Sequence, residues 1–427
     1  MPTAAGKVSA PIRSIRAVPI PSVRADADAC PGALRLHAAA DGPLARVRVP
    51  GGRMTGAQLA VLRTLAARWG DGHVELTSRA NLQLRALKDA PLGDLAAKLQ
   101  GAGLLPSETH ELVRNIVASP LARGLPLGTL DQALCADPSL AELPGRFLFA
   151  LDGGAGDVAF GADVAALPLD DEVAIICAGA DIGLRVTAAE VVPALLAAAH
   201  AFLDERAAQQ APLPSDGDAA GERQRVAWRV RELIDGPARV AERTAAALGR
   251  TLGEPVRLTR PGVREPIGII EQPDGTVAVG ALVPLGRLSD VQLRVLASAE
   301  ALVFTPWRGV VLPGLAPQAA ESWAAALAGA GLEVAAGSRW AGVTTCAGRP
   351  GCAKSLADVR ADADAATVAG EGLPVHWVGC ARGCGSPAGP HVRVEATGTG
   401  YEVRSPHARG VTSVGEVGAL VGAARKG

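Results

Sequence analysis

Long hydrophobic runs are missing from this sequence of 427 residues. No apolar stretch reaches the roughly 20 residues that a membrane-spanning helix requires. The first 25 residues contain no continuous hydrophobic core of the kind found in signal peptides. The charges nearly cancel, with 42 basic against 43 acidic side chains, so no global field favours nucleic acid. We therefore expect a cytoplasmic protein whose partners include neither a membrane nor a nucleic acid.

Lysine is scarce as well, since 37 of the 42 basic side chains are arginine. A chain rich in alanine, glycine, proline and arginine is what a GC-rich genome encodes, so this bias by itself indicates no function. Cysteine is better represented, with seven residues. In a cytoplasmic protein, thiols favour metal or catalytic roles over disulfides.

The length of the chain predicts two domains, because one hydrophobic core rarely extends over so many residues. The stretch PLPSDGDAAGE (212–222) is typical of a linker or a long exposed loop. The residues after it, RQRVAWRVRELI (223–234), have helical spacing. We expect a first repeat at 28–211, a linker with a connecting helix at 212–240, and a second repeat at 241–427.

The two predicted repeats resemble each other. Three pairs of segments align in the same order: 49–62 with 283–296, 74–87 with 302–315, and 190–199 with 416–424. The first pair, VPGGRMTGAQLAVL and VPLGRLSDVQLRVL, needs no gap. This order indicates an internal duplication and predicts pseudo-twofold symmetry, in which a ligand often lies where the two halves meet.

Each repeat mixes strand and helix patterns, which indicates the α+β class. The segment ARVRVP (45–50) alternates like a strand, and TGAQLAVLRTLAARWG (55–70) is an amphipathic helix that Gly70 ends. The apolar face of that helix consists of Leu59, Leu62, Leu65, Ala66 and Trp69. Further strands are predicted at 73–78, 82–87, 147–152, 174–179 and 184–188, and a further helix at 188–206.

Four of the cysteines form two pairs near the end of the chain. Cys346 and Cys352 lie in TTCAGRPGC, and Cys380 and Cys384 lie in GCARGCGSP. Soft thiolates suit iron, and four of them suffice for one [4Fe–4S] cluster. The glycines around them let the backbone approach the cluster and donate N–H bonds to it.

Two other interpretations of these cysteines stay open. A structural zinc site usually has pairs spaced by two to four residues, whereas five residues separate Cys346 from Cys352. Four unrelated buried thiols are the second alternative, although the paired spacing in glycine-rich loops argues against it. Cys30, Cys135 and Cys177 lack such surroundings, and we expect them to be small core residues.

The spacing C-x5-C followed by C-x3-C resembles the cluster signature of sirohaem-dependent sulfite and nitrite reductases. The resemblance extends from about residue 28 to the C-terminus. It implies a pseudo-twofold duplicated fold with ferredoxin-like half-domains and a cluster-binding domain. It also implies that Cys346, Cys352, Cys380 and Cys384 hold a [4Fe–4S] cluster.

Two further segments are similar to the tetrapyrrole-binding segments of that superfamily, LTSRANLQLR (76–85) and VRNIVASP (113–120), and LPGRFLF (143–149) stands where the reductases carry an oxyanion-binding stretch. The resemblance implies tetrapyrrole-binding roles for Thr77, Arg79, Asn81, Gln83, Arg85, Arg114, Asn115 and Arg146. Arginine suits a ring with acetate and propionate groups, because it stays charged and binds carboxylates bidentately.

Within the superfamily the chain resembles the precorrin-3B synthase branch, through ACPGALRLHAAADGPLARVRVPGGR (29–53) and GCARGCGSP (379–387). The resemblance implies precorrin-3A as substrate, O2 as co-substrate, and electrons from NADH through a reductase partner. It implies hydroxylation at C20 with γ-lactone formation from the ring A acetate. The tetrapyrrole pocket would then hold the substrate and not a cofactor.

One departure from the reductases favours this branch. Where they have two lysines that bind and protonate a small oxyanion, this chain has Arg146 and Leu148. Leucine donates no proton, and six-electron reduction of an anion needs repeated proton delivery.

The substrate itself carries no metal, so the resemblance also implies a mononuclear non-haem iron. None of the seven histidines forms a pair with ligand spacing, and the iron ligands stay unassigned. Two alternatives remain. One is a sirohaem-dependent sulfite or nitrite reductase, in which sirohaem fills the pocket. The other is a non-catalytic tetrapyrrole-binding or redox-sensing protein, which would show no O2-dependent turnover.

Overall fold

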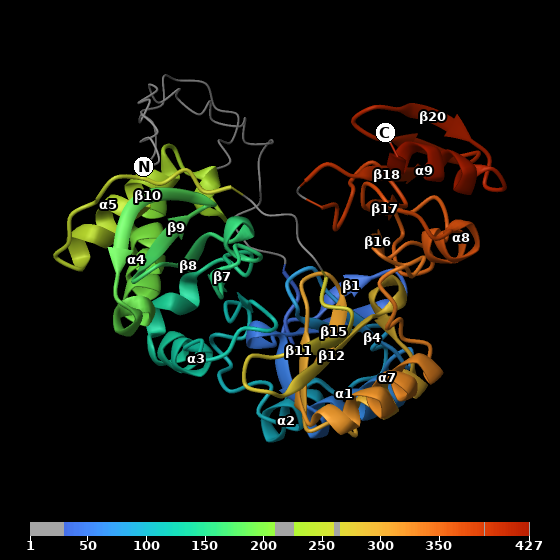
Figure 1. Ribbon diagram of the computed structural model, residues 1–427, viewed down its shortest axis with the longest axis horizontal. Coiled ribbons are helices and arrows are strands. Elements are labelled where there is room, and N and C mark those ends of the chain that lie inside the picture. Colours follow the sequence, from blue (N-terminus) through green and yellow to red (C-terminus); the bar gives the residue numbers. More distant parts are fainter. Residues whose placement is uncertain (1–29, 210–225, 260–264, 388, 427) are drawn as a thin grey trace, which may run out of the picture.

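Two five-stranded antiparallel sheets share one hydrophobic core at the base of the molecule in this computed structural model (Figure 1). The structure describes residues 30–209, 226–259, 265–387 and 389–426, so the predicted linker loop at 212–222 lies outside the described residues. The first sheet has the order β1 (His37–Ala39), β2 (Gly42–Val47), β5 (Leu82–Leu84), β4 (Val74–Leu76), β13 (Arg287–Leu288). The second has the order β11 (Gly268–Glu271), β12 (Val277–Leu282), β15 (Gly309–Leu315), β14 (Ala301–Phe304), β3 (Arg53–Thr55).

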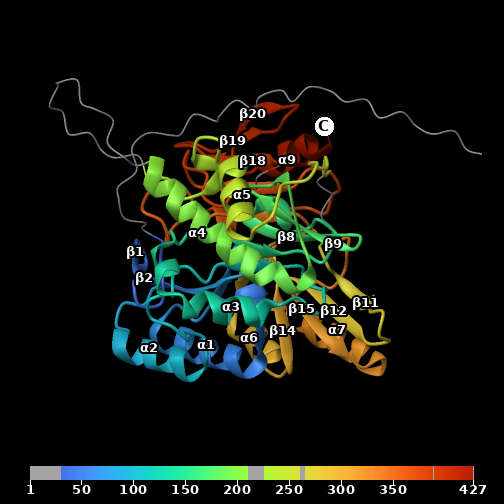
Figure 2. The same cartoon turned by 90° about the vertical axis from the view of Figure 1, so that its left-hand side faces the viewer.

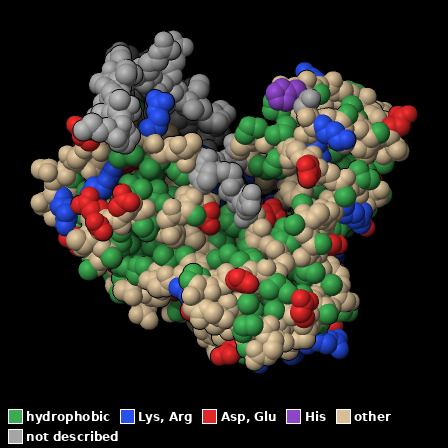
Figure 3. All heavy atoms as spheres, in the orientation of Figure 1, with side chains coloured by type: hydrophobic (Ala, Val, Ile, Leu, Met, Phe, Trp, Pro, Cys, Tyr) green, Lys and Arg blue, Asp and Glu red, His purple; other side chains and the backbone are tan. Residues whose placement is uncertain are grey.

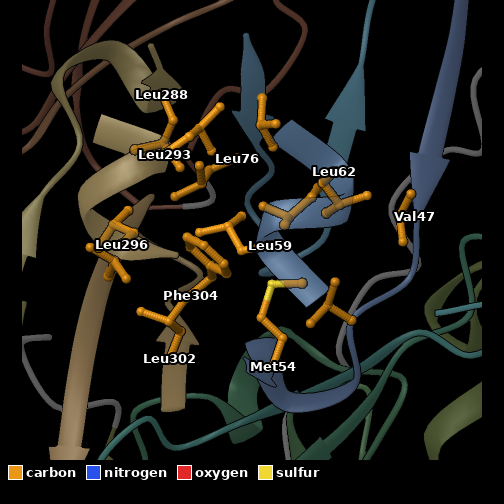
Figure 4. Packing of buried hydrophobic residues seen from close by; sticks show 14 of the residues in the cluster. Val47, Met54, Leu59, Leu62, Leu76, Leu288, Leu293, Leu296, Leu302 and Phe304 are labelled. Atoms are coloured by element: carbon orange, nitrogen blue, oxygen red, sulfur yellow. The ribbon is translucent and has the colours of Figure 1, made fainter. Parts of the chain in front are cut away.

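In each of these sheets, one edge strand comes from the other repeat. β13 pairs with β4, and β3 pairs with β14. Figure 4 shows the consequence, since Leu59 and Leu62 of one repeat face Leu293 and Phe304 of the other in one cluster. The predicted pseudo-twofold duplication is thereby confirmed as an interlocked pair.

The helices beside this core begin with equivalent capping boxes. Thr55 and Gln58 exchange hydrogen bonds at the start of α1 (Gly56–Trp69), and Ser289 and Gln292 do so before α6 (Asp290–Leu296). Such boxes satisfy backbone N–H groups that a helix leaves free at its first turn. Helices α2 (Leu92–Gly101) and α7 (Ala320–Gly329) complete the layer. The predicted face of α1 is buried, with Trp69 partly exposed.

A second sheet-and-helix unit stands on this base (Figures 1 and 2). Its sheet has the order β10 (Ala180–Val186), β9 (Glu172–Cys177), β8 (Val164–Leu169), β7 (Phe149–Leu151), β6 (Ile116–Ala118). Its helices are α3 (Leu127–Ala136), α4 (Val191–Gln209) and α5 (Gly236–Ala247). α4 and α5 pack against each other and against the sheet in one hydrophobic cluster. Residues 230–245 therefore lie spatially with the first repeat.

The helix predicted at 223–234 is wrong for the residues that the structure describes. Only a single 3-10 turn, Val230–Glu232, forms there, and α5 begins four residues later. The reason is tertiary. Arg229 pairs with the buried Asp163, and the Val230 N–H donates to the same carboxylate. This anchoring holds Arg229 in an extended conformation, which overrides the helical spacing of the apolar residues.

The third unit carries the four clustered cysteines and stands beside the second (Figure 1). Its sheet has the order β16 (Val343–Thr345), β17 (Val375–Val378), β18 (Val392–Ala396), β19 (Tyr401–Arg404), β20 (Arg409–Thr412). The first three strands are parallel. Helices α8 (Val359–Ala366) and α9 (Val417–Lys426) pack against the sheet around Trp377 and Tyr401.

The mixture of sheets and helices confirms the α+β class. The boundaries 28–211, 212–240 and 241–427 describe expected repeats and stay a prediction; the packing groups the described residues into three bodies. No helix among the described residues is long and apolar enough to cross a membrane. Figure 3 shows basic and acidic side chains interspersed on one face, in keeping with the balanced charge.

Candidate functional site

Two equivalent turns form the centre of the candidate site. In the first, the Thr77 N–H donates to the Asn81 carbonyl over 2.9 Å, and the Asn81 N–H donates to Thr77 Oγ1. In the second, Thr305 and Gly309 form the same two hydrogen bonds. The threonine in each turn therefore holds the loop closed through its own side chain.

The fourth residue of each turn has a positive φ, 57° at Ala80 and 64° at Arg308. Side chains rarely adopt this region, so its occurrence at both aligned positions shows that the duplication extends to local backbone conformation. The side chains differ, because the arginine of the first turn is Arg79, one position earlier.

Both turns line one cavity of ≈ 470 Å³. Ser78 and Arg79 contribute from the first turn, and Trp307 and Arg308 contribute from the second. The second unit forms another wall, and the third unit contributes the glycine-rich loop that follows Cys384. The cavity therefore lies where all three units meet, and its size suits a small-molecule or cofactor site.

Arg79 and Arg308 are two of the charged side chains that line this cavity. Burial lowers the pKa of each guanidinium to about 10, so both stay charged at neutral pH. Among the described residues neither forms an ion pair or a side-chain hydrogen bond. Both side chains are half-buried, and withdrawing a charge from water without a partner is costly, so two such arginines facing one space indicate an anionic ligand.

A buried ion pair closes the side of the cavity formed by the second unit. Arg229 Nε lies 2.5 Å from Asp163 Oδ2, and burial raises the pKa of Asp163. Arg231 and Glu265 also line the cavity. Burial raises the pKa of Glu265 to about 7, so this carboxyl exchanges its proton near neutral pH.

Leu148 is part of the cavity wall and is 6% exposed. Its backbone N–H donates to Asp163 Oδ2 over 2.9 Å, which fixes this stretch against the buried ion pair. Arg146 lies elsewhere, with its guanidinium 4.9 Å from the centre of the Trp228 ring. Leu148 is thus an apolar surface of the cavity, whereas Arg146 lies outside its lining.

The other two arginines that the sequence motifs indicated are outside the lining of the cavity. Arg85 bonds Asp41 through two nitrogens and donates to the Gly351 carbonyl over 2.7 Å. Arg114 forms a two-bond pair with Asp131, at 2.7 Å each. Both side chains are buried, so these charges hold the framework together.

The amide side chains of the motifs also have internal partners. Asn81 Nδ2 donates to Asn115 Oδ1 over 2.8 Å, and Asn115 in turn donates to the Gly145 and Phe147 carbonyls. Gln83 accepts from Arg46. These bonds connect the base to the stretch that ends in Leu148. The tetrapyrrole-binding roles of Thr77, Asn81, Gln83 and Asn115 stay predictions. In the structure these side chains form hydrogen bonds within the protein.

The four cysteines gather at the edge of the third unit. Cys346, Cys352 and Cys380 are half-buried and Cys384 is exposed. Burial raises the pKa of the Cys384 thiol, and the other three thiols raise it further, which places all four within electrostatic range. The Gly379 N–H donates to Cys346 Sγ over 3.2 Å.

This donor set fits an iron–sulfur cluster. Four thiols with a backbone N–H directed at sulfur are the surroundings such clusters need. Gly379 is required there, because a Cβ would collide with Ser355 Oγ. In the part of the chain that the structure describes, no group of three or more His, Cys, Asp or Glu side chains is placed to hold a single metal ion.

A second cavity, of ≈ 490 Å³, lies between the end of α8 and α9. It has none of the cysteines, and its lining combines apolar side chains with Arg425, Lys426 and Glu371. The meeting point of the three units is therefore the better candidate site.

Comparison with known proteins defines the class of fold. The nitrite/sulfite reductase ferredoxin-like half domain matches residues 37–102 and again residues 270–330. The structure of the Mycobacterium tuberculosis NirA protein superposes with a TM-score of 0.69 at 19% identity, covering 88% of this chain and 79% of that one. The chain thus contains this half domain twice, in the duplicated arrangement that its sheets show.

Among individual proteins, the chain is 27% identical to a precorrin-3B synthase from Sinorhizobium sp, over 87% of this chain and 81% of that protein. It is also 28% identical to a ferredoxin–nitrite reductase from Synechococcus elongatus, over 81% and 74%. These similarities confirm the predicted resemblance to the nitrite and sulfite reductase superfamily and to precorrin-3B synthase within it. The similar proteins are enzymes of the oxidoreductase type.

Proposed function

We propose that this chain is a precorrin-3B synthase, which hydroxylates precorrin-3A at C20 with formation of the γ-lactone from the ring A acetate. One oxygen atom of O2 enters the product, and the other leaves as water after accepting two electrons and two protons. NADH supplies these electrons through a reductase partner. The proposal includes a cytoplasmic location and a mononuclear non-haem iron whose ligands are unassigned.

The observation that carries the proposal is the cavity itself. Two half-buried arginines without an ion-pair partner among the described residues, Arg79 and Arg308, enter it from opposite repeats, and Leu148 forms part of its wall. Acetate and propionate groups on the rim of the ring supply the anions that these arginines lack. The apolar surface at Leu148 suits the flat ring and offers no proton to a small oxyanion.

The resident group that fits the thiols is a [4Fe–4S] cluster held by Cys346, Cys352, Cys380 and Cys384. It would supply electrons one at a time to the site of O2 reduction. The protein itself would bind the ring, orient it through fixed cations, and place the half-buried Glu265 carboxyl where it can hold a proton near neutral pH. This side chain is our candidate for accepting or returning a proton in the cavity.

The alternative is a sirohaem-dependent sulfite or nitrite reductase, which the likeness to ferredoxin–nitrite reductase favours. In that case sirohaem would occupy the same cavity as a cofactor. Absorption separates the two, because sirohaem adds strong bands to the broad brown shoulder of a cluster.

The first experiment is an anaerobic absorption spectrum of the purified protein, with assays of iron, acid-labile sulfide and extractable sirohaem. Iron and sulfide without sirohaem are expected, followed by O2-dependent conversion of precorrin-3A when a reductase and NADH are added. Stoichiometric sirohaem would overturn the proposal in favour of the reductase. Binding of precorrin-3A without O2-dependent turnover would instead indicate a binding or sensing protein.

The cluster assignment has its own control. Cys352→Ser should abolish sulfide incorporation, whereas Cys135→Ser in α3 should retain it, because Cys135 lies in the second unit. Full sulfide in the Cys352→Ser protein would remove this cysteine from the cluster.

A further inference from the structure

A short chain of hydrogen bonds joins the cavity to the loop that carries Cys384. Thr344 lines the cavity from β16, and its Oγ1 lies 2.7 Å from Nδ1 of His376 on the neighbouring strand β17. The two residues are register partners in the parallel ladder. His376 Nε2 lies 3.0 Å from the Cys384 carbonyl oxygen. The imidazole therefore contacts a cavity residue on one side and a cysteine residue on the other.

The chemistry of these groups fixes the direction of each hydrogen bond. A carbonyl oxygen only accepts, so Nε2 carries the proton and donates it to Cys384. In a neutral imidazole the other nitrogen then accepts, so the Thr344 hydroxyl donates to Nδ1 at 2.7 Å, with the Val375 carbonyl as a longer second acceptor at 3.4 Å. His376 is completely buried on the central part of the sheet, which leaves its ring no water as an alternative partner.

The loop after Cys384 packs closely on the same ring. Gly385 has a φ of 84° and lines the cavity. A Cβ at Gly385 would lie 3.5 Å from His376 Cε1 and 3.1 Å from Arg308 Nη2. The imidazole and a cavity arginine therefore both lie beside this loop, which leaves little room for a side chain at Gly385.

We propose that Thr344 and His376 form a link through which occupancy of the cavity alters the surroundings of Cys384, and with it the electronic properties of the cluster. This inference rests on the proposed function, since it takes the ligand to be a carboxylated tetrapyrrole and the cysteines to hold a cluster. His376 acts as a positioning residue.

In this link, a ligand carboxylate and His376 Nδ1 compete to accept the hydrogen bond of the Thr344 hydroxyl. A ligand carboxylate near Thr344 is a stronger acceptor than a neutral imidazole nitrogen, so it draws the hydroxyl away from Nδ1. Hydrogen bonds in a chain polarise one another, so loss of the first weakens the Nε2–H bond to the Cys384 carbonyl. The cysteine loop then relaxes, and hydrogen bonding near the sulfur is a property that sets cluster potential.

The test uses the full chain with its cluster and uroporphyrin, a metal-free tetrapyrrole with acetate and propionate groups, as the probe. Binding is measured by quenching of uroporphyrin fluorescence. The cluster is measured by the EPR spectrum of the reduced protein and by a potentiometric titration, each with and without the probe. We expect binding of uroporphyrin to shift the EPR signal and the midpoint potential of the unaltered protein.

Three variants separate the link from general effects. Thr344→Val keeps the shape of the side chain but removes the hydroxyl, so it should bind the probe and lose the probe-induced shift. Thr344→Ser keeps the hydroxyl and should retain the shift. His391→Asn is the matched control, because His391 lies 6.5 Å from the His376 ring and its own ring bonds the Gly389 carbonyl. It should behave like the unaltered protein.

Each outcome decides between the two proposals. An undiminished shift in Thr344→Val, or binding to the unaltered protein without any shift, would overturn the link and leave the tetrapyrrole assignment standing. Loss of iron from Thr344→Val but not from Thr344→Ser would mean that the hydroxyl holds the loop without any ligand, which also contradicts the link. A clustered protein that does not bind uroporphyrin would overturn both.

Discussion

The turns at 77–81 and 305–309 have the same backbone but different side chains. Both are closed by a threonine, both have a residue at positive φ, and both reach the same cavity. The arginines are offset, since Arg79 precedes the left-handed position and Arg308 occupies it. The duplication therefore provides a symmetric frame in which the charges point to different neighbours.

That offset gives each arginine its own electrostatic surroundings. Arg79 interacts with Asp163 and Arg229 of the second unit, whereas Arg308 interacts with Glu75, Arg360 and Cys346. A ring bound between them would be held from two sides, with Arg308 next to the cysteine loops. The two equivalent turns thus form opposite parts of the cavity. The offset of their arginines places Arg308 on the side of the cavity that adjoins the proposed cluster.

Removing both arginines should give the largest effect. A hydrogen bond to a charged group contributes about 1.5–3 kcal/mol, so each single Arg→Gln change should weaken uroporphyrin binding about 10- to 100-fold. The double variant Arg79→Gln/Arg308→Gln should lose roughly 10²- to 10⁴-fold. Fluorescence titration measures this, with Arg294→Gln on the exposed side of α6 as the control. Unchanged affinity in the double variant would place the ligand elsewhere.

Replacing an arginine that pairs with a carboxylate inside the protein, such as Arg114, should lower stability and leave ligand affinity nearly unchanged. Arg114→Gln leaves Asp131 without its partner, and breaking such a buried pair costs about 3 kcal/mol. Thermal unfolding should therefore occur at a Tm lower by about 3 °C, because the shift per kcal/mol falls as the chain lengthens, with near-normal affinity in the folded protein. An unaltered Tm together with tenfold weaker binding would return Arg114 to the binding set that its motif implied.

The two turns should also differ in their effect on the cluster. Arg308 is within electrostatic range of Cys346, so losing its positive charge disfavours the extra electron and should lower the cluster midpoint potential. Arg79 interacts with Asp163 and Arg229 of the second unit instead, which predicts a smaller change. Potentiometric titration of Arg308→Gln and Arg79→Gln makes the comparison, and equal shifts in the two proteins would contradict the asymmetry.

The smallest expected effect concerns pH. Burial raises the pKa of Glu265 to about 7, so this side chain is neutral below pH 7 and negative above it. A negative Glu265 repels a carboxylated ligand, so affinity should fall a few-fold between pH 6 and pH 8. Glu265→Gln is neutral throughout and should flatten that profile. A profile that persists in the variant would assign the titration to another group.

Much of the base of the molecule could be predicted from local patterns. Helix α1 begins after Thr55 and ends before Gly70 as its spacing and capping residues indicate. The helix at 223–234 could not be ruled out in the same way, because the partner that prevents it, Asp163, is about 65 residues away along the chain. Local spacing carries no information about such a contact.

Some residues of the candidate site could be predicted from the sequence and others could not. Arg79 was indicated by its motif and lines the cavity, whereas Arg308 was missed although the aligned repeats place it in the equivalent turn. Arg231 and Glu265 carried no motif at all. Arg85 and Arg114 occur in the same motifs as Arg79, and only the positions of Asp41 and Asp131 show that their charges are satisfied internally.

The sequence by itself determined the duplication, the α+β class and the cysteine spacing, because repeats, periodicity and spacing are properties of neighbouring residues. The tertiary structure decided the exchange of β3 and β13 between the repeats, and which arginines face a cavity and which face a carboxylate. These choices depend on contacts between residues tens to hundreds of positions apart. Whether a charge is paired is settled only when the chain brings, or fails to bring, an opposite charge to it.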